Sequence, residues 1–177
     1  MGQKKRTRMK MTAQELGQEL RDGTGDFLEH RRAAALLTLV GMASLATISL
    51  YQMGIFKRLP EPSVSVLDAR KVNGSSEAYA ILKTPDAVLG VGSYAVTLGL
   101  IAMGGSNRAR SHPWIPLALA AKSGFDSFQA GALTAKSWRK FRAFSLYSIV
   151  TALGSFLVLP IVLPEARAAW QKIKGFR

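Results

Sequence analysis

Lys122 and Asp126 are the residues whose types and spacing most directly suggest chemistry. They lie four positions apart inside an otherwise apolar stretch, residues 114–135 (WIPLALAAKSGFDSFQAGALTA). On a helix this spacing places both side chains on one face, where they form an ion pair. Ionisable residues within membrane helices are commonly functional, so the pair is a candidate proton or ion relay. A buried structural ion pair is the alternative, and the sequence favours neither.

His30 and His112 are the only histidines, and the chain contains no cysteine. Without thiols, the chain cannot supply a disulfide, a thiolate zinc site, an iron–sulfur ligand or a cysteine nucleophile. Two isolated histidines do not form a metal centre, and we assign no metal site. Each is a candidate ligand for haem iron or chlorophyll magnesium at the end of a span. A lone interfacial histidine without a ligand is the more common situation.

Two further patterns have a simpler explanation than a ligand site. Residues 90–95 (GVGSYA) match the G-x-G-x-x-G/A dinucleotide pattern, which requires a preceding strand and a helix N-terminus. They lie inside an apolar stretch, where small residues favour close helix packing. Residues 2–10 (GQKKRTRMK) are strongly basic without interleaved aromatics. This indicates anionic lipid head groups or a partner protein, and not nucleic acid.

The elements that position these residues are four apolar stretches long enough to span a bilayer. A span needs about 20 residues, because the hydrocarbon core is about 30 Å thick and a helix rises about 1.5 Å per residue. We expect spans at residues 33–52, 87–104, 114–135 and 143–163. The third contains Lys122 and Asp126, and an interfacial or re-entrant segment is its alternative. The first is too long for a signal-peptide core, so we expect it to be retained.

The segments outside these stretches are basic. The chain has 177 residues and a formal charge of +13. Residues 1–32 form a basic N-terminal segment in which Thr12 and Glu15 have capping-box spacing before a short helix. Residues 57–83 form an external loop, and residues 164–177 form a basic tail. Four spans would place 14 lysines and arginines on the side of both termini and 9 on the other. This predicts a multi-pass protein of the cell (inner) membrane with both termini cytoplasmic.

Two segments resemble the vitamin K epoxide reductase family of small four-helix quinone reductases. The first is 72–79 (VNGSSEAY), followed by Thr84, Pro85, Gly90 and Tyr94, and it resembles the family's passage from the external loop into the second span. The second is 145–150 (SLYSIV), which opens the last span where the family carries its active Cys-x-x-Cys. The order and length of the spans also agree, so the resemblance covers residues 33–163. It implies an all-α, integral membrane four-helix bundle.

The redox residues that the resemblance implies are missing. Ser145 and Ser148 stand at the positions of the membrane Cys-x-x-Cys, and Ser75 stands at one loop cysteine position. The other loop position would fall within residues 67–69. Serine hydroxyls cannot form a disulfide, which excludes thiol–quinone exchange by these residues. The resemblance implies that the family's apolar pocket, as a site for quinone or lipid, would lie near Asp86, Tyr94, Ser145 and Ser148. For Ser145 and Ser148, plain helix packing is the alternative.

No catalytic constellation emerges from the sequence, so we expect a protein that is not an enzyme. The expected function is that of an accessory or structural subunit of a larger membrane protein complex, and a complex that handles electrons or quinones would suit the resemblance. Its expected partners are other membrane protein subunits and membrane lipids. The alternative is a stand-alone membrane protein that binds a quinone or a lipid. A third class is a transporter built around Lys122 and Asp126.

Overall fold

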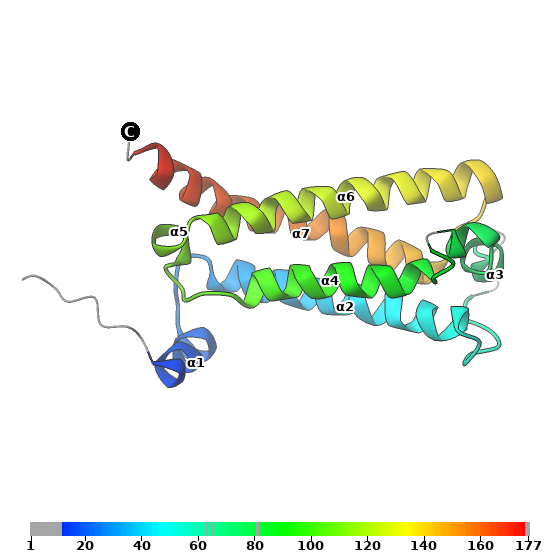
Figure 1. Ribbon diagram of the computed structural model, residues 1–177, viewed down its shortest axis with the longest axis horizontal. Helices are drawn as coiled ribbons and strands as arrows, with labels where there is room; N and C mark the ends of the chain where they lie inside the picture. The colour runs from blue at the N-terminus through cyan, green and yellow to red at the C-terminus, as the bar shows by residue number, and fades with distance from the viewer. Residues whose placement is uncertain (1–11, 63, 65, 81, 176–177) are drawn as a thin grey trace, which may run out of the picture.

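The computed structural model describes residues 12–62, 64, 66–80 and 82–175, and helices are the only regular elements among them (Figure 1). This confirms the all-α fold class. The basic stretch 2–10 lies outside the described residues.

Four long helices form an up-and-down bundle: α2 (Leu28–Gln52), α4 (Asp86–Ala102), α6 (Trp114–Phe141) and α7 (Leu146–Lys174). Consecutive long helices run in opposite directions, as Figure 1 shows. Helix α2 packs against both α4 and α7, α6 packs against α7, and α4 meets α6 over a smaller surface. The connections from α4 to α6 and from α6 to α7 are short, as in up-and-down bundles, whereas α2 and α4 are joined by the external loop.

The short elements lie at the two ends of the bundle. Helices α1 (Ala13–Asp22) and α5 (Arg108–Ser111) lie at the end where α7 finishes, and α3 (Ala69–Asn73) lies at the opposite end (Figure 1). The 3-10 helix η1 (Ser76–Tyr79) directly follows α3 in the chain. The described chain therefore starts and finishes at the same end of the bundle.

Helix α1 begins with the capping box that its sequence predicts. The backbone N–H of Glu15 donates to the Thr12 hydroxyl at 3.3 Å, and the backbone N–H of Thr12 donates to the Glu15 carboxylate at 2.7 Å. Two N–H groups that the helix itself leaves free are thereby satisfied. The helix ends at Gly23, whose N–H bonds the carbonyl of Glu19.

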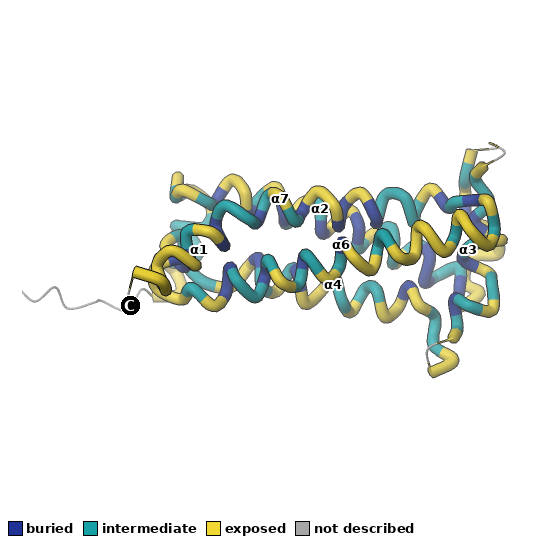
Figure 2. Tube along the Cα trace, turned by 90° about the horizontal axis from the view of Figure 1, so that it is seen from above, coloured by how far each residue is buried: buried dark blue, intermediate teal, exposed yellow. Residues whose placement is uncertain are grey.

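The bundle interior is built from small and branched residues, and large apolar side chains cover its outside. The central cluster consists of Ala34, Ile101, Leu119, Val158 and Val162. Figure 2 shows the exposed positions running along the outer faces of the long helices. Leu36 is 66% exposed and Phe128 73% exposed, although neither is polar. Extensive exposed apolar surface of this kind marks contact with a membrane or with another protein.

Two of the described helices, α2 and α7, are long and apolar enough to cross a membrane. Helix α4 is apolar but shorter, and α6 has the length but carries the Lys122–Asp126 pair. Helix α2 begins at Leu28, before the expected apolar span, and α7 continues through Pro160 and Pro164 to Lys174. The segment expected as a basic tail is thus helical over its described part.

Candidate functional site

The external loop is fastened to the start of α7, and we name this contact the loop–α7 junction (residues 60–73 and 144–148). The carboxylate of Glu61 accepts two backbone N–H bonds, from Leu146 at 2.6 Å and from Ala69 at 2.7 Å. One side chain therefore satisfies free N–H groups at the N-termini of both α7 and α3. Acceptors with negative charge are most favourable at this end of a helix.

Backbone hydrogen bonds close the same junction. The N–H of Phe144 donates to the carbonyl of Val66 at 2.8 Å, and the N–H of Asp68 donates to the carbonyl of Phe144 at 2.9 Å. The hydroxyl of Tyr147 donates to the carbonyl of Pro60 at 3.1 Å. The loop segment 66–69 is therefore held directly against the residues that open α7.

An ion pair between Glu77 in η1 and Lys140 at the end of α6 lies at this end of the bundle. The hydrogen bond from the Lys140 ammonium lowers the pKa of the Glu77 carboxyl to about 2. Likewise, the backbone N–H of Lys71 lowers the pKa of Asp68, which caps α3. Both carboxylates are stabilised in their charged form by hydrogen bonds from groups of the loop and its neighbour.

Gln52, at the end of α2, joins the loop to the first turn of α4. Its amide nitrogen donates to the Asp86 carboxylate at 2.7 Å and to the Asn73 carbonyl at 3.1 Å. Its amide oxygen accepts the backbone N–H of Ala87 at 3.3 Å, and its own carbonyl accepts the hydroxyl of Tyr79 at 2.8 Å. Sequence analysis did not identify Gln52. The signal that the sequence offered was a polar amide residue at the end of an apolar stretch.

The structure brings three of the four predicted pocket residues to this end of the bundle. Asp86 bonds Gln52, and the Ser148 hydroxyl donates to the side-chain oxygen of Asn73 at 3.3 Å. Ser145 is fully enclosed, and neither its hydroxyl nor the side-chain nitrogen of Asn73 has a hydrogen-bond partner among the described residues. Gln52 and Asn73, which sequence analysis missed, thus connect Asp86 with Ser148.

The fourth predicted residue, Tyr94, lies elsewhere and connects α4 with α7 through its hydroxyl. Its hydroxyl donates to the Thr151 carbonyl at 2.8 Å and lies 2.7 Å from the hydroxyl of Ser155. Ser127 of α6 donates to the carbonyl of Ser155 at 2.9 Å. Because Tyr94 is eight residues beyond Asp86, the two are separated by about 12 Å of helix. The structure therefore does not gather the four residues around one cavity.

A small cavity of about 10 Å³ is lined by Tyr94 and Ser123 and by residues of all four long helices. The hydroxyl of Ser123 is buried and has no protein partner among the described residues. A space of this volume holds about one water molecule, and a quinone ring is far larger.

Lys122 and Asp126 form the ion pair that their spacing predicts. The Lys122 ammonium lies 2.5 and 2.6 Å from the two carboxylate oxygens, and it also donates to the hydroxyl of Ser93 at 2.9 Å. The hydroxyl of Thr97 donates to the carboxylate at 2.9 Å. Both charges are thereby paired and hydrogen-bonded, which is the condition for placing them within an apolar bundle. A structural pair and a relay share this geometry.

At the opposite end, two buried arginines satisfy the last carbonyls of α4. Arg108 donates to the carbonyls of residues 100, 101 and 103, and Arg31 donates to those of residues 101–105. Glu165 of α7 receives two further bonds from Arg108, each of 2.7 Å. Sequence analysis counted both arginines only among the positive charges that flank the spans and missed this cluster. The signal that it overlooked was Glu165, an acidic residue directly after an apolar span.

The remaining candidates form no shared site. His30 and His112 are both exposed, and no group of three or more potential metal ligands occurs in the described part of the chain. A Cβ added at Gly90 would lie 3.1 Å from the Leu45 side chain, in agreement with close helix packing. Gly92 faces open space. The glycines of segment 90–95 therefore lie in the middle of helix α4. A dinucleotide site needs them in a turn between a strand and a helix.

These features define an all-α bundle whose loop is docked on its last helix. The family model of the vitamin K epoxide reductase family matches residues 32–163, and the chain belongs to this family. No curated protein and no solved structure matches the chain. The family is membrane-embedded, in accord with the two long apolar helices. Its members are normally thiol oxidoreductases, whereas this chain has no cysteine.

Proposed function

We propose that this protein is a non-redox member of its family and acts as an accessory subunit of a larger membrane protein complex. The observation that carries the proposal is the loop–α7 junction. Where the resemblance places thiols that exchange electrons between loop and membrane, this chain has Glu61 and backbone groups that tie the two together. A loop fixed in one position suits a surface that docks onto a partner.

The surroundings of the two serines support a structural role. Ser145 is enclosed by protein, and Ser148 is bonded to Asn73. The interior cavity beside Tyr94 has room for about one water molecule. Quinone turnover would require both a redox couple and space for a ring. We place the protein in the inner membrane, with both termini cytoplasmic, on the distribution of lysine and arginine.

The test is the native size of the tagged full chain, extracted from its own membrane in mild detergent, with mass spectrometry of the proteins that co-purify. We expect defined membrane proteins at fixed stoichiometry. Glu61→Ala should release the loop and reduce their recovery, whereas Asp22→Ala, which removes an exposed carboxylate on α1, should not. A single 19.2 kDa chain that carries only lipid or quinone would contradict the proposal.

One observation favours the second candidate, a stand-alone protein that binds quinone or lipid. The Ser145 hydroxyl and the Asn73 amide nitrogen are buried polar atoms without a protein partner among the described residues. Such atoms commonly bond a water or a ligand. Stoichiometric quinone on the purified monomer, lost in Ser145→Leu and retained in the exposed variant Ser111→Leu, would support this candidate over the subunit.

A further inference from the structure

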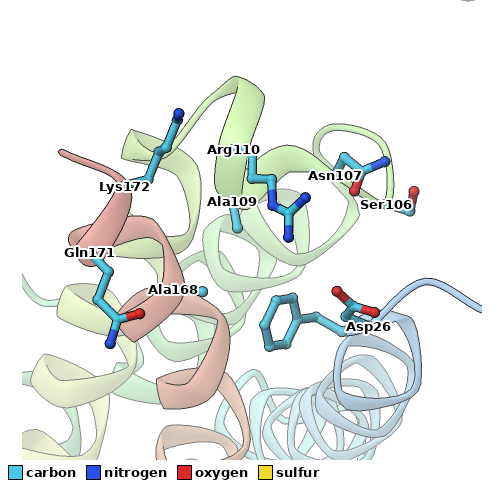
Figure 3. A pocket seen from close by; sticks show the side chains of 9 residues that line it. Asp26, Ser106, Asn107, Ala109, Arg110, Ala168, Gln171 and Lys172 are labelled. Carbon is cyan, nitrogen blue, oxygen red and sulfur yellow. The ribbon is translucent and has the colours of Figure 1, made fainter. Parts of the chain in front are cut away.

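A cavity lies at the end of the bundle opposite the loop–α7 junction. It has a volume of about 280 Å³ and lies between the start of α2, helix α5 and the last turns of α7. Its polar lining includes Asp26, Asn107, Arg110 and Gln171 (Figure 3). This volume is just below the range of about 300–1,000 Å³ for small-molecule pockets, so the cavity suits a compact polar group.

The cavity is lined by two positive side chains, Arg110 and Lys172, and one negative side chain, Asp26. The Lys172 ammonium points away from Asp26 (Figure 3). Figure 3 shows the Arg110 guanidinium and the Asp26 carboxylate pointing into the space between α5 and the start of α2. Within the part of the chain that the structure describes, neither side chain has a hydrogen-bond or ion-pair partner. A ligand with a negative group facing Arg110 and a positive group facing Asp26 can therefore pair with both side chains.

The helices place this cavity at the level of lipid head groups. The uncharged stretch of α2 begins at residue 33, and Leu28 lies five residues before it. The uncharged stretch of α7 ends at residue 163, and Ala168 lies five residues after it. Five residues correspond to about 8 Å of helix. The head-group layer on each side of the hydrocarbon core is about 5–8 Å thick. Trp170, which lies between the lining residues Ala168 and Gln171 in the α7 sequence, is 51% exposed, and tryptophan is enriched at this depth.

We propose that the cavity binds the head group of a phospholipid that carries a primary ammonium beside its phosphate, as phosphatidylethanolamine does. Arg110 bonds the phosphate, because the planar guanidinium matches phosphate oxygens in pairs. Asp26 accepts hydrogen bonds from the ammonium. A glycerol head group offers Asp26 only neutral hydroxyls in place of a charged N–H donor, and a choline head group has no N–H to donate. The acyl chains lie along the exposed apolar faces of the bundle.

The experiment is native mass spectrometry of the delipidated full chain in mild detergent, titrated with phosphatidylethanolamine, phosphatidylcholine or phosphatidylglycerol of identical acyl chains. We expect the wild type to bind phosphatidylethanolamine about tenfold more tightly than the other two. Asp26→Asn should remove this preference. Arg110→Gln should weaken phosphatidylethanolamine binding about tenfold. Asp22→Asn and Arg139→Gln, which remove exposed charges away from the cavity, should leave the preference unchanged.

Three outcomes would overturn the proposal. Equal binding of the three lipids by the wild type would remove the head-group preference. A preference that survives both Asp26→Asn and Arg110→Gln would place the lipid elsewhere on the bundle. Soluble phosphoethanolamine that binds as tightly as the lipid would identify a free metabolite, and not the membrane, as the source of the ligand. All variants change exposed side chains, and unchanged helix content by circular dichroism verifies their folding.

Discussion

Arg108 and Glu165 form a two-point ion pair in which both nitrogen–oxygen distances are 2.7 Å and both side chains are enclosed, with 0% and 2% exposed. The pair lies at the end of α4, which is 17 residues long. At about 1.5 Å per residue, α4 is shorter than the hydrocarbon core, so its last carbonyls need partners within the protein. Arg108 and Arg31 provide them, and Glu165 compensates the charge of Arg108 by direct contact.

Glu165→Gln should lower the free energy of unfolding by about 3 kcal/mol or more. Removing one partner of a buried ion pair leaves the other charge uncompensated, which typically costs about 3–5 kcal/mol. Unfolding in mixed detergent micelles, followed by tryptophan fluorescence, measures the change. Glu29→Gln is the control, because Glu29 pairs with Arg32 on the surface with 78% of its side chain exposed. Equal stability of the two variants would contradict the role of Glu165.

Gly41→Ala should destabilise the bundle by about 1–3 kcal/mol through overpacking. A Cβ at Gly41 would lie 2.5 Å from a ring carbon of Tyr94. The ring cannot easily move away, because its hydroxyl is bonded to Thr151 and lies against Ser155.

Gly92→Ala is the matched control, since a Cβ there meets nothing within 4 Å. Alanine is the better helix former by about 1 kcal/mol, so this variant should be neutral or more stable. Thermal unfolding of both variants in one detergent makes the comparison. A Gly41→Ala protein as stable as the wild type would mean that α2 and α4 pack less tightly than the structure indicates.

Sequence reasoning succeeded where a local rule determines the structure. The 3.6-residue period brings Lys122 beside Asp126, and Thr12 and Glu15 form their capping box within one turn. It failed where partners are remote in the chain. Glu165 finds Arg108 57 residues away, and Gln52 finds Asp86 34 residues away. Such contacts depend on which helix faces meet, and neither composition nor spacing specifies that.

The resemblance predicted a pocket near four residues, and the structure separates one of them from the other three. Asp86, Ser145 and Ser148 lie at the loop end, whereas the hydroxyl of Tyr94 reaches Ser155 on α7. The amides of Gln52 and Asn73 connect Asp86 with Ser148. A motif gives the position of a residue along its helix, while its hydrogen-bond partners depend on the three-dimensional arrangement.

Lys122→Met and Asp126→Asn should each destabilise the protein more than the double variant does. Each single change leaves one charge without its partner inside the bundle, where an unpaired charge costs about 2.5–3.5 kcal/mol on insertion scales. The double variant removes both charges together. A double-variant cycle of unfolding free energies measures the coupling between the two side chains. Additive effects would show that the ion pair contributes nothing to stability.

The same double variant tests transport. Ion flux that it retains in proteoliposomes would exclude the pair as a transport site.

Glu77 should make the stability of the loop end fall in acid. Its pKa is about 2 in the folded protein, against an ordinary value of 4.5, because Lys140 stabilises the charged carboxylate. The unfolded chain therefore binds more protons in this range, so the contribution of Glu77 is complete above pH 4.5 and disappears as the pH falls towards 2. The thermal midpoint should decline more steeply over this window in the wild type than in Glu77→Gln. Identical pH profiles would contradict the ion pair.

Asn107→Cys and Lys136→Cys should react with a membrane-impermeant maleimide from opposite sides of the membrane. The chain has no cysteine, so each variant carries a single thiol, and both positions are exposed. Helix α6 has 28 residues between α5 and the turn into α7, and its length of about 42 Å exceeds the hydrocarbon core of about 30 Å. Lys122 and Asp126 neutralise each other and are hydrogen-bonded to Ser93 and Thr97, so a membrane span can accommodate them. Labelling of both variants from the same side would instead make α6 a re-entrant or interfacial helix, and would require a topology with fewer than four spans.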